Sequence, residues 1–144
     1  HLHAAMAELA AAGLRVLEVS PLLETRPLAA PGRRRFLNCA VAVETDLPPR
    51  LLLRRLRRIE RRHGRRGRPR ANLPRTLDID LIFYGGVRIL TAELQLPHPR
   101  FVQRPFVLAP LAAIAPRLRP PRRDRTVAQL ARRLTPPVVP LSRS

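Results

Sequence analysis

The sequence predicts a chain of mixed helices and strands, and three observations support this class. Apolar residues recur at helical spacing in residues 1–12 and 46–63. Alternating or β-branched apolar runs at 14–20, 36–45 and 77–84 are typical of strands. Glycine and proline fall between these segments, where turns and helix ends are expected. The 144 residues are enough to bury one core, so we expect a single domain.

The N-terminal part of the chain is predicted to be a helix followed by a strand. Residues 1–12 are good helix formers, and Gly13 is expected to end the helix as a left-handed C′ residue. Residues 14–20 predict a strand, and residues 21–25 are expected to extend it past a proline that suits a sheet edge. Residues 26–35 contain no core-forming pattern and therefore predict a loop.

The second predicted strand, residues 36–45, contains one amide side chain among apolar neighbours. Asn38 must find hydrogen-bond partners there, and both the local backbone and the edge of a ligand stay open as partners. Cys39 is the one cysteine of the chain, so it forms no internal disulfide. We expect it to act as a small buried hydrophobe rather than as a nucleophile.

Residues 46–63 predict a helix with an apolar stripe and an arginine-rich face. Asp46 offers an N-cap, a Pro-Pro pair suits the first turn, and Gly64 is expected to end the helix. The arginines are best explained as a solvated face. Glu60 is the one acid in the body of this helix and flanks the stripe, so it is expected either to face a pocket or to pair with an arginine. The buried stripe is predicted to consist of Leu52, Leu56 and Ile59.

Residues 77–84 are the predicted strand with the strongest chemical signal. Side chains alternate faces along a strand, so Asp78 and Asp80 are expected to point the same way, with carboxylates about 6.5–7 Å apart. Two like charges held so close on an apolar strand favour a divalent cation with oxygen ligands. The alternative is that both aspartates cap a turn or pair with surface arginines. The basic loop before the strand, residues 64–75, has the flexible arginines that a polyphosphate needs.

The C-terminal part is predicted to contain a hairpin strand, a rigid loop and two short helices. Residues 87–90 are expected to pair with the strand at 77–84. His98 lies between two prolines, so it is expected on a rigid loop, either as a functional residue or as an ordinary surface histidine. Residues 106–115 and 126–134 predict the two helices.

The net charge of +18 would suit a polyanionic partner. All 28 basic residues are Arg and none is Lys, however, and this bias together with abundant Ala, Leu and Pro indicates a GC-rich genome. Aromatic residues make up only 3% of the chain, which argues against binding single strands by base stacking. No apolar run is long enough to span a bilayer and no signal peptide is evident, so we expect a cytoplasmic protein.

Six short segments of the sequence follow one another in a particular order and spacing across residues 14–116. They are Glu24-Thr25 with Pro27-Leu28, Phe36-Leu37-Asn38, Ile59-Glu60 with Gly64-Arg65, Pro74-Arg75-Thr76-Leu77-Asp78-Ile79-Asp80, Pro97-His98-Pro99-Arg100, and Arg104-Pro105-Phe106-Val107-Leu108 with Pro110-Leu111. In this order the segments resemble the 6-hydroxymethyl-7,8-dihydropterin pyrophosphokinase family of folate biosynthesis. Six ordered segments are far more specific than any single motif among them.

The resemblance implies an α+β, ferredoxin-like fold with an antiparallel sheet flanked by helices. It also implies a Mg²⁺-dependent enzyme that transfers the β,γ-diphosphate of ATP to the pterin hydroxymethyl group and releases AMP. ATP and a reduced pterin would be its partners, and two Mg²⁺ ions its cofactors. The protein is expected to be a monomer or a weak dimer with no membrane or nucleic-acid partner. Its domain would span residues 1–134, followed by a tail over residues 135–144.

The resemblance further implies roles for individual residues. Asp78 and Asp80 would hold the metal ions, and Arg65 and Arg75 would act with them as catalytic residues that neutralise phosphate charge. The ATP-binding residues would be Leu53, Glu60, Arg70, Leu81, His98 and Arg104. The pterin-binding residues would be Thr25 and Leu28 through their backbone, Asn38 at the pterin edge, and Phe36 and Phe106 on the two faces of the ring.

Members of this family open with a strand that ends in a Gly-Ser-Asn-Leu-Gly-like turn, which this sequence does not contain. We therefore expect a domain without that strand, and a catalytically dead fragment of the enzyme is one alternative function. A basic nucleic-acid-binding module, suggested by the net charge, is the other.

Overall fold

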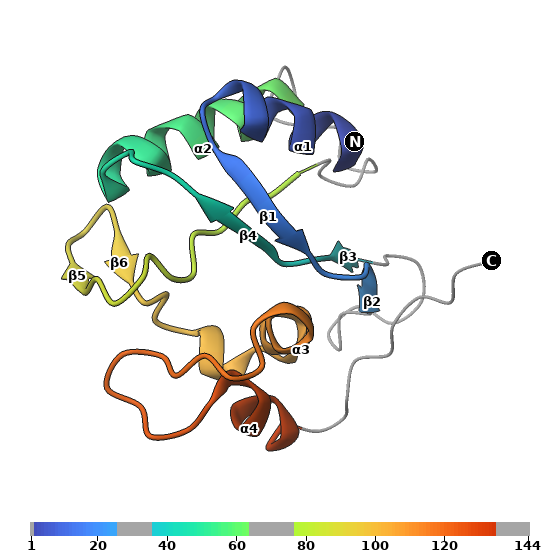
Figure 1. The fold of residues 1–144 in the computed structure, drawn as a ribbon, viewed down its shortest axis with the longest axis vertical. Helices are drawn as coiled ribbons and strands as arrows, with labels where there is room; N and C mark the ends of the chain where they lie inside the picture. Colours follow the sequence, from blue (N-terminus) through green and yellow to red (C-terminus); the bar gives the residue numbers. More distant parts are fainter. Residues whose placement is uncertain (1, 26–35, 64–76, 135–144) are drawn as a thin grey trace. The chain divides into compact units, whose positions relative to one another are not determined.

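The structure is a computed structural model that describes residues 2–25, 36–63 and 77–134 (Figure 1). The chain divides into two compact units. Unit 1 contains His1–Leu17 and Val43–Leu81, and unit 2 contains Glu18–Ala42 and Ile82–Ser144. The expectation of a single domain over residues 1–134 stays a prediction.

Unit 1 is built on two helices that pack against each other. Figure 1 shows α1 (Leu2–Ala11) beside α2 (Pro49–His63), and both match their predicted segments. Gly13 has a φ of 89°, so it ends α1 in the left-handed conformation, as predicted. The predicted stripe of α2 is buried against α1 and the residues that follow it. The buried apolar residues of unit 1 are Ala5, Leu9, Leu14, Leu52, Leu56 and Ile59.

Two polar contacts also join α1 to α2. Arg55 donates from Nη1 to the carbonyl oxygen of Ala12 at 3.3 Å, just past the end of α1, where helix carbonyls lack intrahelical partners. Nε2 of His63 lies 3.1 Å from Oε2 of Glu8. Because α2 ends at His63, this second contact places the last turn of α2 beside α1.

Two pairs of short strands replace the two long strands that the sequence predicts. β1 (Arg15–Val19) pairs with β4 (Val41–Glu44), while β2 (Leu23–Thr25) pairs antiparallel with β3 (Phe36–Asn38). In the second pair, Leu23 lies opposite Asn38 and Thr25 lies opposite Phe36. The predicted strand over 36–45 is therefore interrupted after Asn38, and the predicted extension over 21–25 is a separate strand.

Ser20 explains the interruption. It is 5% exposed, and its hydroxyl accepts a hydrogen bond from the backbone N–H of Ala40 at 2.7 Å. Its own N–H donates to the carbonyl oxygen of Ala40 at 2.8 Å. A side chain thus takes one of the backbone donors that would otherwise continue the ladder, so the regular pairing stops at this point.

The predicted strand over residues 77–84 is wrong, because these residues form no strand in the structure. A strand is defined by ladder hydrogen bonds to a neighbour, and the backbone here bonds to other groups. The N–H of Ile79 donates to the Glu60 carboxylate at 2.7 Å. The carbonyl oxygen of Ile82 accepts from the N–H of His98 at 2.9 Å.

The predicted hairpin strand at 87–90 also has a different partner. β5 (Ile89–Leu90) pairs antiparallel with β6 (Gln95–Leu96) and not with residues 77–84. The short turn between β5 and β6 explains this pairing. The hydroxyl of Thr91 accepts from the N–H of Leu94 at 3.0 Å and donates to its carbonyl oxygen at 2.9 Å, so the turn closes on itself.

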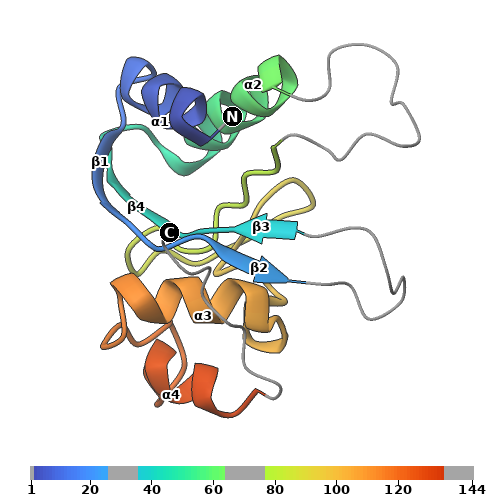
Figure 2. The same ribbon diagram turned by 90° about the vertical axis from the view of Figure 1, so that its right-hand side faces the viewer.

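The core of unit 2 is built around a pair of helices. Figure 2 shows α3 (Pro105–Ile114) beside α4 (Val127–Arg132), and the short 3-10 helix η1 (Phe101–Gln103) precedes α3. Both helices confirm their predicted segments. Thr126 begins α4 with a capping box, in which its side chain and that of Gln129 bond to each other's backbone N–H. The core cluster consists of Phe101, Leu108, Val127 and Leu130.

The predicted α+β class is confirmed, with antiparallel pairing in the β2–β3 and β5–β6 sheets. In the described part of the chain the strands form three two-stranded sheets. None of the helices among the described residues is long and apolar enough to cross a membrane.

Candidate functional site

The two aspartates of residues 77–84 are both exposed to solvent. Asp78 and Asp80 are exposed, whereas Leu77, Ile79 and Leu81 between and beside them are half-buried. This alternation of exposure agrees with the expected alternation of side chains, although the segment is not a strand, and the common direction of the two carboxylates stays a prediction. The apolar neighbours anchor the segment, so the carboxylates are presented to solvent.

The donor set of this segment fits Mg²⁺. Among the described residues, no group of three or more His, Cys, Asp or Glu side chains is placed to hold a metal ion. Mg²⁺ is commonly held by only one or two carboxylates together with water and substrate phosphates, rather than by a cage made of protein ligands alone. Asp78 and Asp80 offer two carboxylates, which is enough for such a site, and their role as metal ligands stays a prediction.

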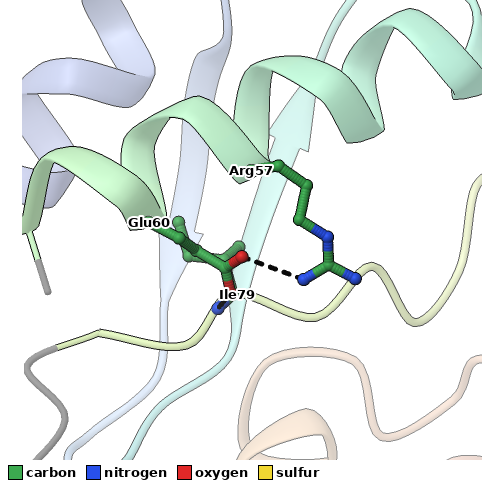
Figure 3. Close-up of polar contacts among 3 residues, drawn as sticks. All are labelled: Arg57, Glu60 and Ile79. Carbon is green, nitrogen blue, oxygen red and sulfur yellow. Dashed lines mark hydrogen bonds and ion pairs between the residues drawn. The ribbon is translucent and has the colours of Figure 1, made fainter. Parts of the chain in front are cut away.

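Glu60 of α2 is the buried acid next to this segment. Its side chain is 1% exposed, and Oε1 accepts from Arg57 Nη1 at 2.9 Å. Oε2 accepts from the backbone N–H of Ile79 at 2.7 Å. Figure 3 shows Glu60 reaching from α2 toward Ile79, with Arg57 one turn earlier on the helix. Of the two expectations for Glu60, the pairing with an arginine is confirmed.

Leu53 and Leu81 are the other two predicted ATP-side residues of unit 1. Leu53 lies on α2 and is half-buried, and Leu81 is the last residue of unit 1 before the chain enters unit 2. Both positions present partly accessible apolar surface, as expected of residues beside a nucleotide. Their contact with ATP stays a prediction.

In unit 2, His98 lies on the loop between β6 and η1 and is half-buried. Its backbone N–H donates to the carbonyl oxygen of Ile82, as described above, and its ring Nδ1 accepts a hydrogen bond from the backbone N–H of Arg100 at 3.3 Å. The loop is therefore held at both the backbone and the ring, which agrees with the rigid loop that the flanking prolines predict. With Nδ1 as an acceptor, the neutral ring carries its proton on Nε2.

Arg104 and Phe106 lie together at the start of α3. Arg104 is the N-cap residue, and Phe106 is in the first turn. The Arg104 guanidinium carbon is 5.7 Å from the centroid of the Phe106 ring, a cation–π distance. The predicted phosphate contact and the predicted pterin face are thus neighbours in the structure.

The remaining predicted pterin residues that the structure describes lie on β2 and β3. Asn38 is half-buried at the end of β3, and Thr25 and Phe36 are backbone partners in the β2–β3 register. α3 packs against both strands, so the element that carries Phe106 adjoins the elements that carry these three residues. The predicted residues Leu28, Arg65, Arg70 and Arg75 lie outside the described residues.

The single cysteine is less buried than the sequence predicts. Cys39 is half-buried, and desolvation by burial raises the pKa of its thiol above the ordinary value. A raised pKa keeps the sulfur protonated, so it is a poor nucleophile at neutral pH.

Two residues with clear structural roles were not singled out in the sequence. Arg57 belongs to the arginine-rich face of α2, which was interpreted as solvated, but its spacing of three residues from Glu60 is the spacing at which helical side chains meet. Ser20 bonds to Ala40, which is twenty residues away. No local pattern indicates that contact.

A model of the 7,8-dihydro-6-hydroxymethylpterin-pyrophosphokinase family matches residues 1–116 of the chain. The chain belongs to this family. The match covers α1 through α3 and therefore all of the site residues named above.

Individual relatives agree with the family assignment. The chain is 42% identical to the 2-amino-4-hydroxy-6-hydroxymethyldihydropteridine pyrophosphokinase of Synechocystis sp. over 131 residues. The aligned residues make up 90% of this chain and 66% of that protein. The Bacillus subtilis protein of the same name is 42% identical over 103 residues, 72% of this chain and 61% of that protein. The folate synthesis bifunctional protein of Arabidopsis thaliana is 43% identical over 99 residues, 69% of this chain and 20% of that protein. The chain spans 66% or less of the length of each of these relatives.

Proposed function

We propose that this chain transfers the β,γ-diphosphate of ATP to the hydroxymethyl group of 6-hydroxymethyl-7,8-dihydropterin and releases AMP, as a step of folate biosynthesis. The observation that carries the proposal is the pair of exposed carboxylates, Asp78 and Asp80, in a chain of the pyrophosphokinase family. The family match supports this reaction over the basic nucleic-acid-binding alternative.

The proposed reaction is an in-line displacement at the β-phosphorus. The pterin hydroxyl oxygen forms a bond to that phosphorus, the bond between it and the α,β-bridging oxygen breaks, and AMP leaves with that oxygen while the hydroxyl proton passes to solvent. Such transfers depend on positioning and charge neutralisation more than on a strong base. Asp78 and Asp80 would hold two Mg²⁺ ions, which supply electrophilic polarisation of the triphosphate.

The chain's own cations would complete the neutralisation of the triphosphate. Arg65, Arg70 and Arg75 are proposed to contact its phosphate oxygens, since guanidinium groups bind phosphate through paired hydrogen bonds. His98 would add a donor through Nε2, because its Nδ1 already accepts a backbone N–H. Arg104 would act from the start of α3.

The pterin is proposed to bind on the side formed by β2, β3 and α3. Phe36 and Phe106 would stack on the faces of the ring, and the amide of Asn38 would bond to its polar edge, where it can both donate and accept. Backbone groups of Thr25 and Leu28 would complete the pocket. The packing of α3 against β2 and β3 supports this grouping.

The test is an assay of AMP release from ATP in the presence of Mg²⁺ and the reduced pterin. Wild-type protein should form AMP, and Asp78→Asn and Asp80→Asn should each reduce the rate by at least about 100-fold, because each removes one metal ligand. Asp124→Asn is the matched control, since Asp124 is equally exposed but lies between α3 and α4. Wild-type protein that binds both ligands and forms no AMP above background would overturn the proposal. A cytoplasmic location and a monomeric or weakly dimeric state stay predictions.

A further inference from the structure

We propose that Glu60 is a positioning residue that sets the two metal-binding carboxylates through the backbone of Ile79. This inference rests on the proposed role of Asp78 and Asp80. It assigns Glu60 a way of serving the ATP site without touching the nucleotide.

The first argument is the direction and burial of the Glu60 side chain. The carboxylate is 1% exposed, and each of its oxygens accepts a hydrogen bond from a different protein group. A buried carboxylate is stable only when it is paired and hydrogen-bonded, and here Arg57 supplies the charge while Ile79 supplies the backbone donor. The side chain is therefore turned into the protein, away from the solvent-facing carboxylates of Asp78 and Asp80.

The second argument is the place of Ile79 in the chain. Its N–H belongs to the planar peptide group that also contains the Cα and carbonyl of Asp78, so holding this N–H fixes the plane from which the Asp78 side chain departs. Asp80 follows one residue later. Because the hydrogen bond is made at Ile79, between the two aspartates in the sequence, it restrains the backbone of both, and that of Asp78 most directly.

The third argument is that residues 77–84 have no strand ladder to hold them. In most sheets, a metal-binding segment is aligned by regular hydrogen bonds to a neighbouring strand. Here the structure assigns no strand to 77–84, and the bond to Glu60 holds the segment at Ile79, between the two aspartates. The bond is 2.7 Å long and charge-assisted, which makes it stronger than an ordinary backbone hydrogen bond. α2 thereby serves as the rigid support of the metal-binding carboxylates.

Arg57 has a different role in this arrangement. Its side chain is 43% exposed and bonds only one oxygen of Glu60 in the pair shown in Figure 3. It compensates the negative charge of the buried Glu60 carboxylate. Without Arg57, that charge would be a third uncompensated negative charge beside Asp78 and Asp80. Removing Arg57 should therefore leave the bond to Ile79 in place, whereas shortening Glu60 should break it.

The first measurement is amide hydrogen exchange of Ile79 in the full chain without metal or nucleotide. Glu60→Asp, which is one methylene shorter, should lower the protection of the Ile79 amide at least about tenfold relative to wild type, since the donor loses its partner. Glu60→Gln keeps an acceptor oxygen at the same reach and should keep most of the protection. Arg57→Gln should also keep it. Unchanged Ile79 protection in Glu60→Asp would overturn the proposed bond.

The second measurement is metal binding and turnover by the same variants. With a non-hydrolysable ATP analogue, Glu60→Asp should bind Mn²⁺ about tenfold more weakly by electron paramagnetic resonance, and its kcat should fall about 10- to 100-fold, as expected when reacting groups are misplaced by about 1 Å. The KM for the pterin should change less than twofold. Glu60→Gln should restore both metal binding and kcat to within about threefold of wild type. If metal binding required the negative charge of Glu60 itself, Glu60→Gln would not restore them.

Two control variants separate this role from general stability. Arg58→Gln alters an exposed arginine of the same helix, and Glu93→Gln alters an exposed acid of unit 2. Both should match wild type in Ile79 exchange and metal binding. If Glu60→Asp fails to fold, the comparison of Glu60→Gln and Arg57→Gln with wild type still applies, and loss of Mn²⁺ binding in either with full Ile79 protection would overturn the proposal.

The outcome also separates this inference from the proposed function. A chain that forms no AMP, yet loses Ile79 protection and Mn²⁺ binding together in Glu60→Asp, would refute the reaction and support the positioning role. A Glu60→Asp variant that has lost Ile79 protection but still forms AMP at the wild-type rate would refute the positioning role and support the reaction.

Discussion

Replacing Asp80 by Asn should remove the metal-dependent activity and slightly raise the stability of the metal-free protein. Two residues of extended backbone span about 6.5–7 Å, which we take as the separation of the two carboxylates. Because both aspartates are exposed, the water dielectric applies, and two unit charges at that distance repel by about 0.6 kcal/mol. For a chain of this length such a gain corresponds to an increase of about 2 °C in Tm.

Thermal unfolding of metal-free protein at low ionic strength measures this change. The increase in Tm for Asp80→Asn should disappear in about 1 M salt, where the Debye length falls to about 3 Å. Asp124→Asn is the informative control, because Asp124 lies between arginines in the sequence and its removal deletes attraction rather than repulsion. A fall of several degrees in Asp80→Asn would refute the reasoning, since it would show that the aspartates stabilise the fold as turn caps or arginine partners.

Three further changes test the packing and the hydrogen bonds of the fold by denaturant unfolding. Leu108→Ala should lower the free energy of unfolding by about 2–5 kcal/mol because Leu108 is 0% exposed, whereas Leu90→Ala, at 86% exposure, should change it by less than about 0.5 kcal/mol. Ser20→Ala should cost about 1–3 kcal/mol, since the buried N–H of Ala40 loses its acceptor; no change would mean that water replaces the hydroxyl. Thr126→Ala should cost about 1 kcal/mol through the lost capping box, and Thr126→Ser should restore most of it.

The helices were predictable because their signals are local. The apolar stripe of α2 and the glycine after α1 are both set by residues within a few positions of one another. The exposure of Asp78 and Asp80 around the half-buried Ile79 is local in the same way, since it agrees with the alternation of neighbouring side chains.

The strands were less predictable because their hydrogen bonds are not local. Ser20 interrupts two strands through Ala40, and β5 pairs with β6 through a turn that Thr91 closes. The backbone of Ile79 bonds to a glutamate on α2, which is nineteen residues away in the sequence. The bonds of Ser20 and Glu60 join residues about twenty positions apart, so they are not visible in a window of a few residues. The Thr91 turn is local, but it decides which partner β5 takes.

The family was predictable from the sequence, whereas the roles of the individual site residues stay predictions and their geometry could not be predicted. The order of six motifs indicated the family that the match over residues 1–116 shows. The structure adds that Glu60 pairs with Arg57 and Ile79, and that Arg104 lies on the ring of Phe106. These pairings depend on rotamers and on contacts between elements, which a list of motifs does not contain.

The products formed from ATP and the reduced pterin test the central claim most directly. Phosphorus-31 NMR of the reaction with Mg²⁺ should show AMP and a pterin diphosphate in equal amounts, and Asp78→Asn and Asp80→Asn should form neither. This result is expected because attack at the β-phosphorus releases the α-phosphate with the nucleoside. Formation of ADP, or of no product by protein that binds both ligands, would contradict a diphosphate transfer at the Asp78 and Asp80 site.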